Sequence, residues 1–140
     1  MPIQFVLLPL FVEVLLTFGL LFWLAPLRNA DFRNGVRPSD VALGEPKWSR
    51  RAQQVAKCFD NQFQLPVLFY VLTILSIVTR HADIVFVVLA WIFVLTRLGH
   101  AYVHTTSNIV RLRGAIFGIG GLTLCIAWII FMVRILAGLP

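Results

Sequence analysis

The stretch KCFDNQFQLP, residues 57–66, stands at the entrance of an apolar run that reaches Val78. Polar side chains at this density enter a hydrophobic segment only beside polar neighbours or water, because a polar group stranded in hydrocarbon is costly. On a helix, Lys57, Asn61 and Gln64 lie on one face. We therefore predict that this face points into a helical bundle, where it either holds a small polar ligand or bridges neighbouring helices.

The composition around this stretch is that of an integral membrane protein. The chain has 140 residues, of which 59% are hydrophobic and 13% charged, and its mean hydropathy is +0.88. A soluble domain of this size cannot bury so much apolar surface, so we predict a single membrane domain over residues 1–140. The net charge of +6 comes from basic residues beside the apolar segments, which indicates lipid head groups and not nucleic acid as partners.

Four apolar segments are long enough to cross a bilayer as helices. The sequence therefore predicts an all-α, four-helix transmembrane bundle. We expect Pro66 to bend the second helix and Pro26 to mark the exit of the first. The polar residues 28–50 are expected to form a loop with a short helical turn at residues 39–43. The predicted spans are 3–27, 49–79, 84–105 and 110–137.

An even number of spans places both termini on one side of the membrane. The loop after the first span and the link after the third then share the other side, and both are basic. Because positive charge marks cytoplasmic loops, we predict that both termini are non-cytoplasmic.

Two features inside the spans indicate contacts with neighbouring helices. Glu13 lies near the middle of the first span, and we expect it to face inward, either protonated or paired with a cation such as Arg97. Gly114, Gly118 and Gly121 form a small-residue stripe that permits close helix approach.

The third span becomes polar in its second half, where Arg97, His100 and His104 lie near one another on a helix, and Arg113 opens the fourth span. The histidines can satisfy backbone carbonyls, and Arg113 can reach out to head groups. A metal site is disfavoured, because no Cys, Asp or Glu is spaced to complete one. Arg97 lies deeper, and a buried cation among amides suits an anionic guest or a thiolate.

These motifs resemble those of the membrane-associated eicosanoid and glutathione metabolism family (MAPEG), particularly its bacterial branch, over nearly the whole chain. In Lys57-x-x-x-Asn61-x-x-Gln64 the family usually has Arg, Asn and Glu, which contact glutathione. Asn61 matches this pattern. Lys57 and Gln64 are conservative departures, although Gln64 cannot form an ion pair with an amino group.

The second matching segment is Arg97-x-x-His100-x-x-x-His104, where the family has Arg-x-x-His-x-x-x-Tyr. Arg113 falls at the position of the arginine that stabilises the glutathione thiolate, so the resemblance implies a catalytic role for it. Phe117 replaces a frequent tyrosine. Both arginines are therefore present, while both hydroxyl groups are missing.

The resemblance implies a glutathione-dependent transferase or peroxidase that acts on lipophilic electrophiles. Glutathione would be its cofactor, bound by Lys57, Asn61, Gln64, Arg97, His100 and His104. The resemblance also implies a homotrimer with ligand sites between subunits, in a bacterial inner membrane. The missing tyrosines keep a second hypothesis open, namely a non-catalytic membrane protein that binds a lipid or organises a larger assembly.

Overall fold

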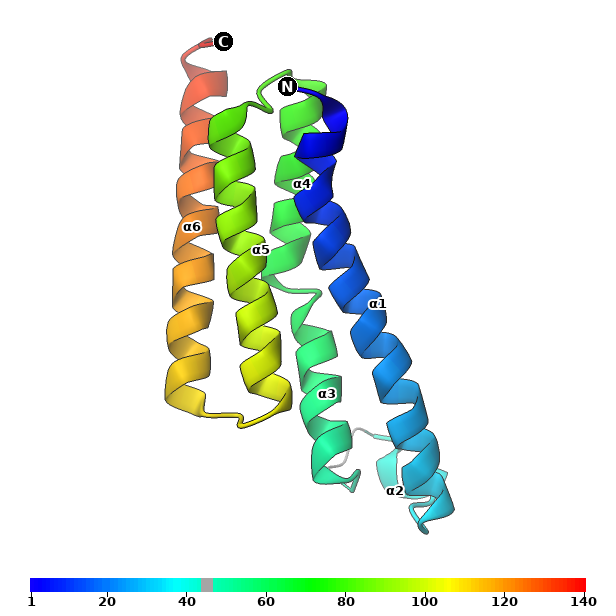
Figure 1. The fold of residues 1–140 in the computed structure, drawn as a ribbon. Helices are drawn as coiled ribbons and strands as arrows, with labels where there is room; N and C mark the ends of the chain where they lie inside the picture. The colour runs from blue at the N-terminus through cyan, green and yellow to red at the C-terminus, as the bar shows by residue number, and fades with distance from the viewer. Residues whose placement is uncertain (44–46) are drawn as a thin grey trace.

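The computed structural model describes residues 1–43 and 47–140, which form helices and no strands (Figure 1). Four helical segments in this described part are long and apolar enough to cross a membrane. One of them consists of two consecutive helices, α3 and α4. The all-α bundle predicted from the sequence is thus confirmed. The helices are α1 (Ile3–Arg33), α2 (Pro38–Val41), α3 (Arg50–Asn61), α4 (Leu65–Val78), α5 (Ile84–Thr105) and α6 (Val110–Leu136).

Helix α1 continues past Pro26 to Arg33, so the prediction that the first span ends near residue 27 is wrong for the helix itself. Two contacts support the extra turns. The Asp31 carboxylate accepts a hydrogen bond of 2.9 Å from the Ser49 backbone N–H, and the Arg28 guanidinium lies 5.0 Å from the centre of the Trp48 ring. A proline removes only one helical hydrogen bond, and tertiary contacts can offset that loss.

The predicted loop of residues 28–50 is therefore shorter than expected. Its helical turn was expected at residues 39–43, but α2 spans Pro38–Val41. The Asp40 carboxylate accepts the Arg37 backbone N–H at 3.1 Å. Gly44 and Pro46, which the sequence analysis included in this loop, lie outside the described residues.

The second span is interrupted and not merely bent. Helix α3 ends at Asn61 and α4 begins at Leu65, with Pro66 in the first turn of α4. Proline has no N–H and disfavours helical geometry in the residue before it, so a helix cannot easily run through this point. The interruption places the end of α3 and its backbone carbonyls in the middle of the bundle (Figure 1).

Helix α5 has the predicted bounds, and α6 ends one residue earlier than predicted. Asp83 caps α5 by accepting the Phe86 N–H at 3.1 Å, and its carboxylate pairs with Arg134 of α6 at 2.7 Å. Partial burial raises the pKa of Asp83, but these two contacts outweigh it, so the pKa lies below its ordinary value of 3.8.

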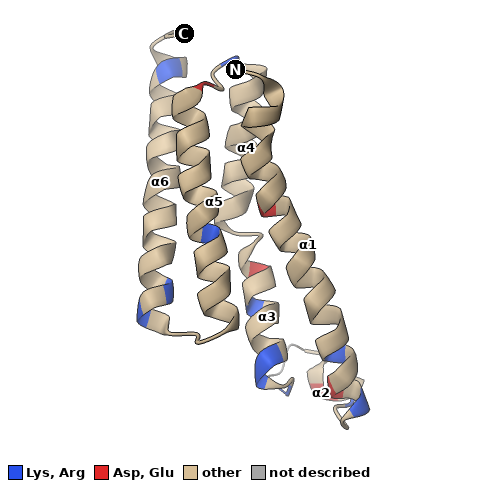
Figure 2. Ribbon diagram, in the orientation of Figure 1, with Lys and Arg blue, Asp and Glu red and all other residues tan. Residues whose placement is uncertain are grey.

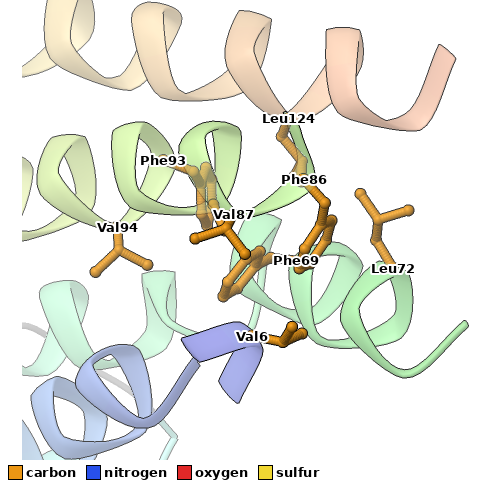
Figure 3. Packing of buried hydrophobic residues seen from close by; sticks show 9 residues of the cluster. Val6, Phe69, Leu72, Phe86, Val87, Phe93, Val94 and Leu124 are labelled. Carbon is orange, nitrogen blue, oxygen red and sulfur yellow. The ribbon is translucent and has the colours of Figure 1, made fainter. Parts of the chain in front are cut away.

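The half of the bundle that contains both chain ends, called here the terminal half, has an apolar core (Figure 3). Phe69 of α4 and Phe93 of α5 lie at its centre with ring centroids 5.1 Å apart. Side chains from α1 and α6 pack around them. The other buried members are Val6, Leu72, Phe86, Val87, Ala90, Val94 and Leu124.

Of the predicted glycine stripe, only Gly121 faces another helix of the chain, where an added Cβ would make ordinary contact with Leu65 at 3.6 Å. A Cβ added at Gly114 or Gly118 would meet no atom within 4 Å, whereas a Cβ at Gly120 would lie 2.5 Å from the Thr96 Oγ1 atom. Gly120 is therefore the residue that lets α6 approach α5.

Both termini lie at the same end of the bundle, as the even number of spans requires (Figure 1). Most lysine and arginine residues lie in the opposite half of the bundle (Figure 2). Large apolar side chains cover the outside of the bundle, including Leu15 at 69% exposure and Phe22 at 71%. A lipid environment is the natural solvent for such a surface.

Candidate functional site

A cavity of about 700 Å³ opens in the half of the bundle opposite the termini, called here the polar half. It lies among α3, the second half of α5 and the first two turns of α6. Its volume falls in the range of small-molecule sites. It is lined by Arg50, Gln53, Gln54, Lys57, Asp60, Asn61, Gln64, His100, His104, Asn108, Val110, Arg113, Gly114 and Phe117.

Six of the seven site residues predicted from the sequence line this cavity. They come from three helices and the α3–α4 connection, so the fold brings together segments far apart in the chain. The six residues are Lys57, Asn61, Gln64, His100, His104 and Arg113.

Arg97, the seventh, lies behind the cavity wall with 1% of its surface exposed. Its Nη2 donates to the Asn61 side-chain oxygen at 2.8 Å and is 3.4 Å from the Asn61 backbone oxygen. Because Asn61 is the last residue of α3, the guanidinium also neutralises the negative end of that helix. Arg97 therefore positions Asn61 and does not itself reach the cavity surface.

Glu13 lies beside this pair and is completely buried, which confirms that it faces inward. It interacts electrostatically with Arg97. Neither carboxylate oxygen has a hydrogen-bond partner among the described residues, and the same holds for Nε and Nη1 of Arg97. Glu13 and Arg97 are therefore two buried polar groups of the membrane interior without a hydrogen bond between them.

Arg113 is held by a residue that the sequence analysis did not identify. Its Nη1 donates to the Asn108 side-chain oxygen at 2.7 Å. Asn108 has a backbone φ of 51°, a left-handed conformation that asparagine tolerates better than most residues. An asparagine just before a predicted helix was the available sign of this role.

His100 and His104 lie one helical turn apart with ring centroids 5.5 Å apart, and the His100 ring lies 5.9 Å from that of Phe117. Both histidines are at least nine-tenths buried, and their Nδ1 atoms have no hydrogen-bond partner in residues 1–43 and 47–140. The described part of the chain contains no cluster of three or more His, Cys, Asp or Glu side chains that could hold a metal ion. The histidines thus line the cavity wall with unused hydrogen-bonding capacity.

The cavity also contains Arg50 and Asp60, which the sequence analysis did not assign to the site. Arg50 precedes Lys57 by seven residues and so lies on the same helical face. Asp60 directly precedes Asn61 and lies beside that face. Together with Lys57 and Arg113 these residues give the cavity three cations and a carboxylate, a predominantly positive interior with one negative group.

Comparison with known protein families supplies the decisive observation. The model of the MAPEG family matches residues 6–133, which is nearly the whole chain. The chain belongs to the MAPEG family. It is therefore an integral membrane protein of that family, with membrane-spanning helices of the expected number. Comparisons with curated proteins and with solved structures found no match.

The matched range includes both segments that carry the resemblance, residues 57–64 and 97–104. His104 and Phe117, which stand where the resemblance described above expects tyrosines, both line the cavity. Any chemistry in this cavity must therefore rely on groups other than tyrosine hydroxyls at these two positions.

Proposed function

We propose that this MAPEG protein is a glutathione-dependent transferase or peroxidase that acts on lipophilic electrophiles. One observation carries the proposal. Except for Arg97, the residues that resemble the family's glutathione contacts in two distant sequence segments line one cavity together with Arg113. A cavity of this size, charge and position suits a small anionic peptide that reacts at a membrane.

The charges of the cavity complement those of glutathione. Glutathione carries two carboxylates and one amino group, and the cavity offers Arg50 and Lys57 for the carboxylates. Gln64 replaces the usual glutamate, but Asp60 lines the same cavity and supplies a carboxylate for the amino group. The side-chain NH2 group of Asn61, whose oxygen accepts from Arg97, and the amide of Gln64 are available for the peptide groups.

Arg113 is the residue that we assign to catalysis. It lies in the first turns of α6, where no side chain of the described residues caps the helix and the backbone dipoles favour negative charge. The guanidinium and the helix terminus together favour the thiolate of glutathione over the thiol. Glutathione bound here would supply a thiolate nucleophile for an electrophilic carbon or a peroxide oxygen, and Arg113 would stabilise its negative charge.

A second candidate function is a non-catalytic membrane protein that holds a lipid or organises an assembly. It is favoured by His104 and Phe117, because the cavity then lacks a hydroxyl donor at both positions. In that case the cations would recognise an anionic head group and would not activate a thiol.

We further propose that the chain assembles as a homotrimer with its sites completed between subunits. Gly114 lines the cavity, and both it and Gly118 face outward with open space around them. A neighbouring helix can pack closely on such a surface. The basic polar half faces the cytoplasm in this proposal, and the termini lie outside a bacterial inner membrane.

Isothermal titration of the detergent-solubilised protein with glutathione tests the proposed function. We expect saturable binding that is weakened in Lys57→Gln and unchanged in Arg33→Gln, which removes an exposed arginine outside the cavity. Turnover of a chromogenic aryl halide or a lipid hydroperoxide should accompany binding. Binding without turnover would select the second candidate, and absence of binding would exclude the enzyme.

A further inference from the structure

An apolar groove of about 300 Å³ runs between α1 and α5 on the outside of the polar half. Leu16 and Gly19 of α1 and Leu98 of α5 line its inner part. Trp23 and Tyr102, both with exposed ring surface, line the end nearest the basic loops. Tryptophan and tyrosine prefer the depth of the lipid head groups, so the groove extends from that level into the hydrocarbon.

A second pocket, of about 450 Å³, lies at the N-terminus of α3 beside the link that follows α5. It is lined by Arg50, Arg51, Gln54, Thr106 and Ser107. These side chains supply two guanidinium groups, an amide and two hydroxyls, and no carboxylate lines the pocket. This set of groups binds a phosphate and offers nothing to neutralise a quaternary amine.

Arg51 connects the groove to the pocket. Its Nη1 donates to the Thr105 backbone oxygen at 2.9 Å, and its guanidinium lies 5.7 Å from the centre of the Trp23 ring. Thr105 and Trp23 both line the groove, while Arg51 lines the pocket. The apolar groove therefore ends at a cationic group held in place at head-group depth.

We propose that the groove and the pocket together bind one anionic phospholipid of the leaflet beside the basic loops. One acyl chain lies along Gly19, and the phosphate lies against Arg51 and the hydroxyl of Ser107, since the Thr106 hydroxyl donates to the Tyr102 backbone oxygen. The charge of the pocket selects an anionic lipid over a zwitterionic one, because two arginines face the head group without a carboxylate. The pocket shares Arg50 and Gln54 with the 700 Å³ cavity, whereas Arg51, Ser107 and the whole apolar groove lie outside that cavity.

Native mass spectrometry of the detergent-solubilised protein tests the proposal by counting bound phosphatidylglycerol and phosphatidylcholine. We expect tighter binding of phosphatidylglycerol by the wild type. Arg51→Gln should weaken phosphatidylglycerol binding about fivefold, the effect of one arginine near a membrane surface. Arg51→Lys should largely retain the preference for phosphatidylglycerol over phosphatidylcholine. Arg33→Gln removes the same charge from the exposed end of α1 and should leave it unchanged.

Gly19→Leu tests the acyl-chain part of the site. A Cβ at Gly19 meets no atom within 4 Å, so the leucine side chain can fill the groove without disturbing the fold. We expect it to reduce binding of both lipids, whereas Ala25→Leu, an exposed position on the same helix outside the groove, should not.

Three results would overturn the proposal. The first is equal binding of both lipids by the wild type, and the second is wild-type lipid binding in Arg51→Gln or Gly19→Leu. The third is a change in the number of chains per particle in Gly19→Leu without a change in bound lipid. That outcome would show that the groove is occupied by another copy of the chain.

Discussion

The terminal half and the polar half of the bundle bury different kinds of side chain. In the terminal half, apolar residues surround Phe69 and Phe93, and a buried hydroxyl such as that of Thr73 bonds to its own helix, at 2.9 Å from the Phe69 oxygen. In the polar half, by contrast, Arg97 and His104 are buried with nitrogen atoms that have no partner in the described residues.

An unsatisfied buried polar group costs about 1–3 kcal/mol, so the polar half is not built for stability alone. Its apolar cluster is small, comprising Leu20, Leu24, Val55, Cys58 and Ala101. Apolar packing therefore fixes the bundle at one end, while the other end keeps polar groups in place for a ligand. Mutations in the two halves should therefore differ in what they impair.

The largest effect is expected for Arg97→Met, at the boundary between the halves. The change removes the buried cation that interacts with Glu13 and leaves Asn61 without its donor. We expect a loss of about 3 kcal/mol in the free energy of unfolding, the upper end of the cost of leaving a buried partner unsatisfied. Thermal or denaturant unfolding in detergent micelles measures the loss.

The double variant Glu13→Leu/Arg97→Met is the matched control. Replacing both partners of a buried pair by apolar residues is often close to neutral, so much of the lost stability should return. A double variant no more stable than Arg97→Met alone would show that the two charges do not compensate each other.

Asn61→Ala should reduce ligand affinity more than it reduces the stability of the fold. It removes a cavity amide whose oxygen is fixed by Arg97. We expect the affinity for glutathione to fall by about 1–3 kcal/mol, as is typical for a lost buried partner. Calorimetric titration measures this, with Asn29→Ala as the control at an exposed position on α1. Unchanged affinity in a folded Asn61→Ala protein would assign Asn61 a structural role only.

Asp60→Asn tests whether Asp60 replaces the carboxylate that Gln64 lacks. Asp60 is exposed in the cavity, so the loss of affinity for glutathione should be about 1 kcal/mol or less. Glutathione without its amino group should bind the variant and the wild type equally. An equal loss for both ligands would contradict the pairing of Asp60 with the amino group.

The smallest effect is expected in the terminal half, at Asp83. Because the pKa of Asp83 is lowered in the folded state, the charged form stabilises the fold above pH 3.8 and loses that contribution as the pH falls further. Asp83→Asn keeps a helix-capping side chain and removes the charge. We expect a difference below about 1 kcal/mol, because the pair with Arg134 is partly exposed.

Unfolding temperatures measured at several pH values check this prediction. The difference between the wild type and Asp83→Asn should be constant above pH 3.8 and should shrink below it. A difference that widens towards acid pH would contradict the direction of the pKa shift.

The spans could be predicted from the sequence because hydropathy and length nearly determine them in a bilayer. The range 84–105 agrees with α5 at both ends. The helix boundaries near prolines were predicted less accurately. Pro26 lies inside α1 because contacts of Arg28 and Asp31 support the helix, whereas Pro66 begins a new helix.

The candidate site could be predicted where polar residues repeat along one helical face, as do Lys57, Asn61 and Gln64. The roles of Asp60 and Asn108 could not be predicted. Asp60 lies beside that helical face, and Asn108 lies in a link where its left-handed backbone conformation places the side chain. Arg97 was predicted as a ligand contact, but only the three-dimensional arrangement places it behind Asn61. Whether these residues bind glutathione stays a prediction.

The most direct test of the account is the thiolate absorbance of glutathione mixed with the protein at neutral pH. We expect a signal in the wild type and in Arg111→Leu, which removes a neighbouring exposed arginine outside the cavity. In Arg113→Leu we expect no signal, and turnover reduced by about 10²-fold or more, as for other charge-stabilising groups. A wild type without thiolate signal and without glutathione binding, or an Arg113→Leu protein with full turnover, would contradict the account.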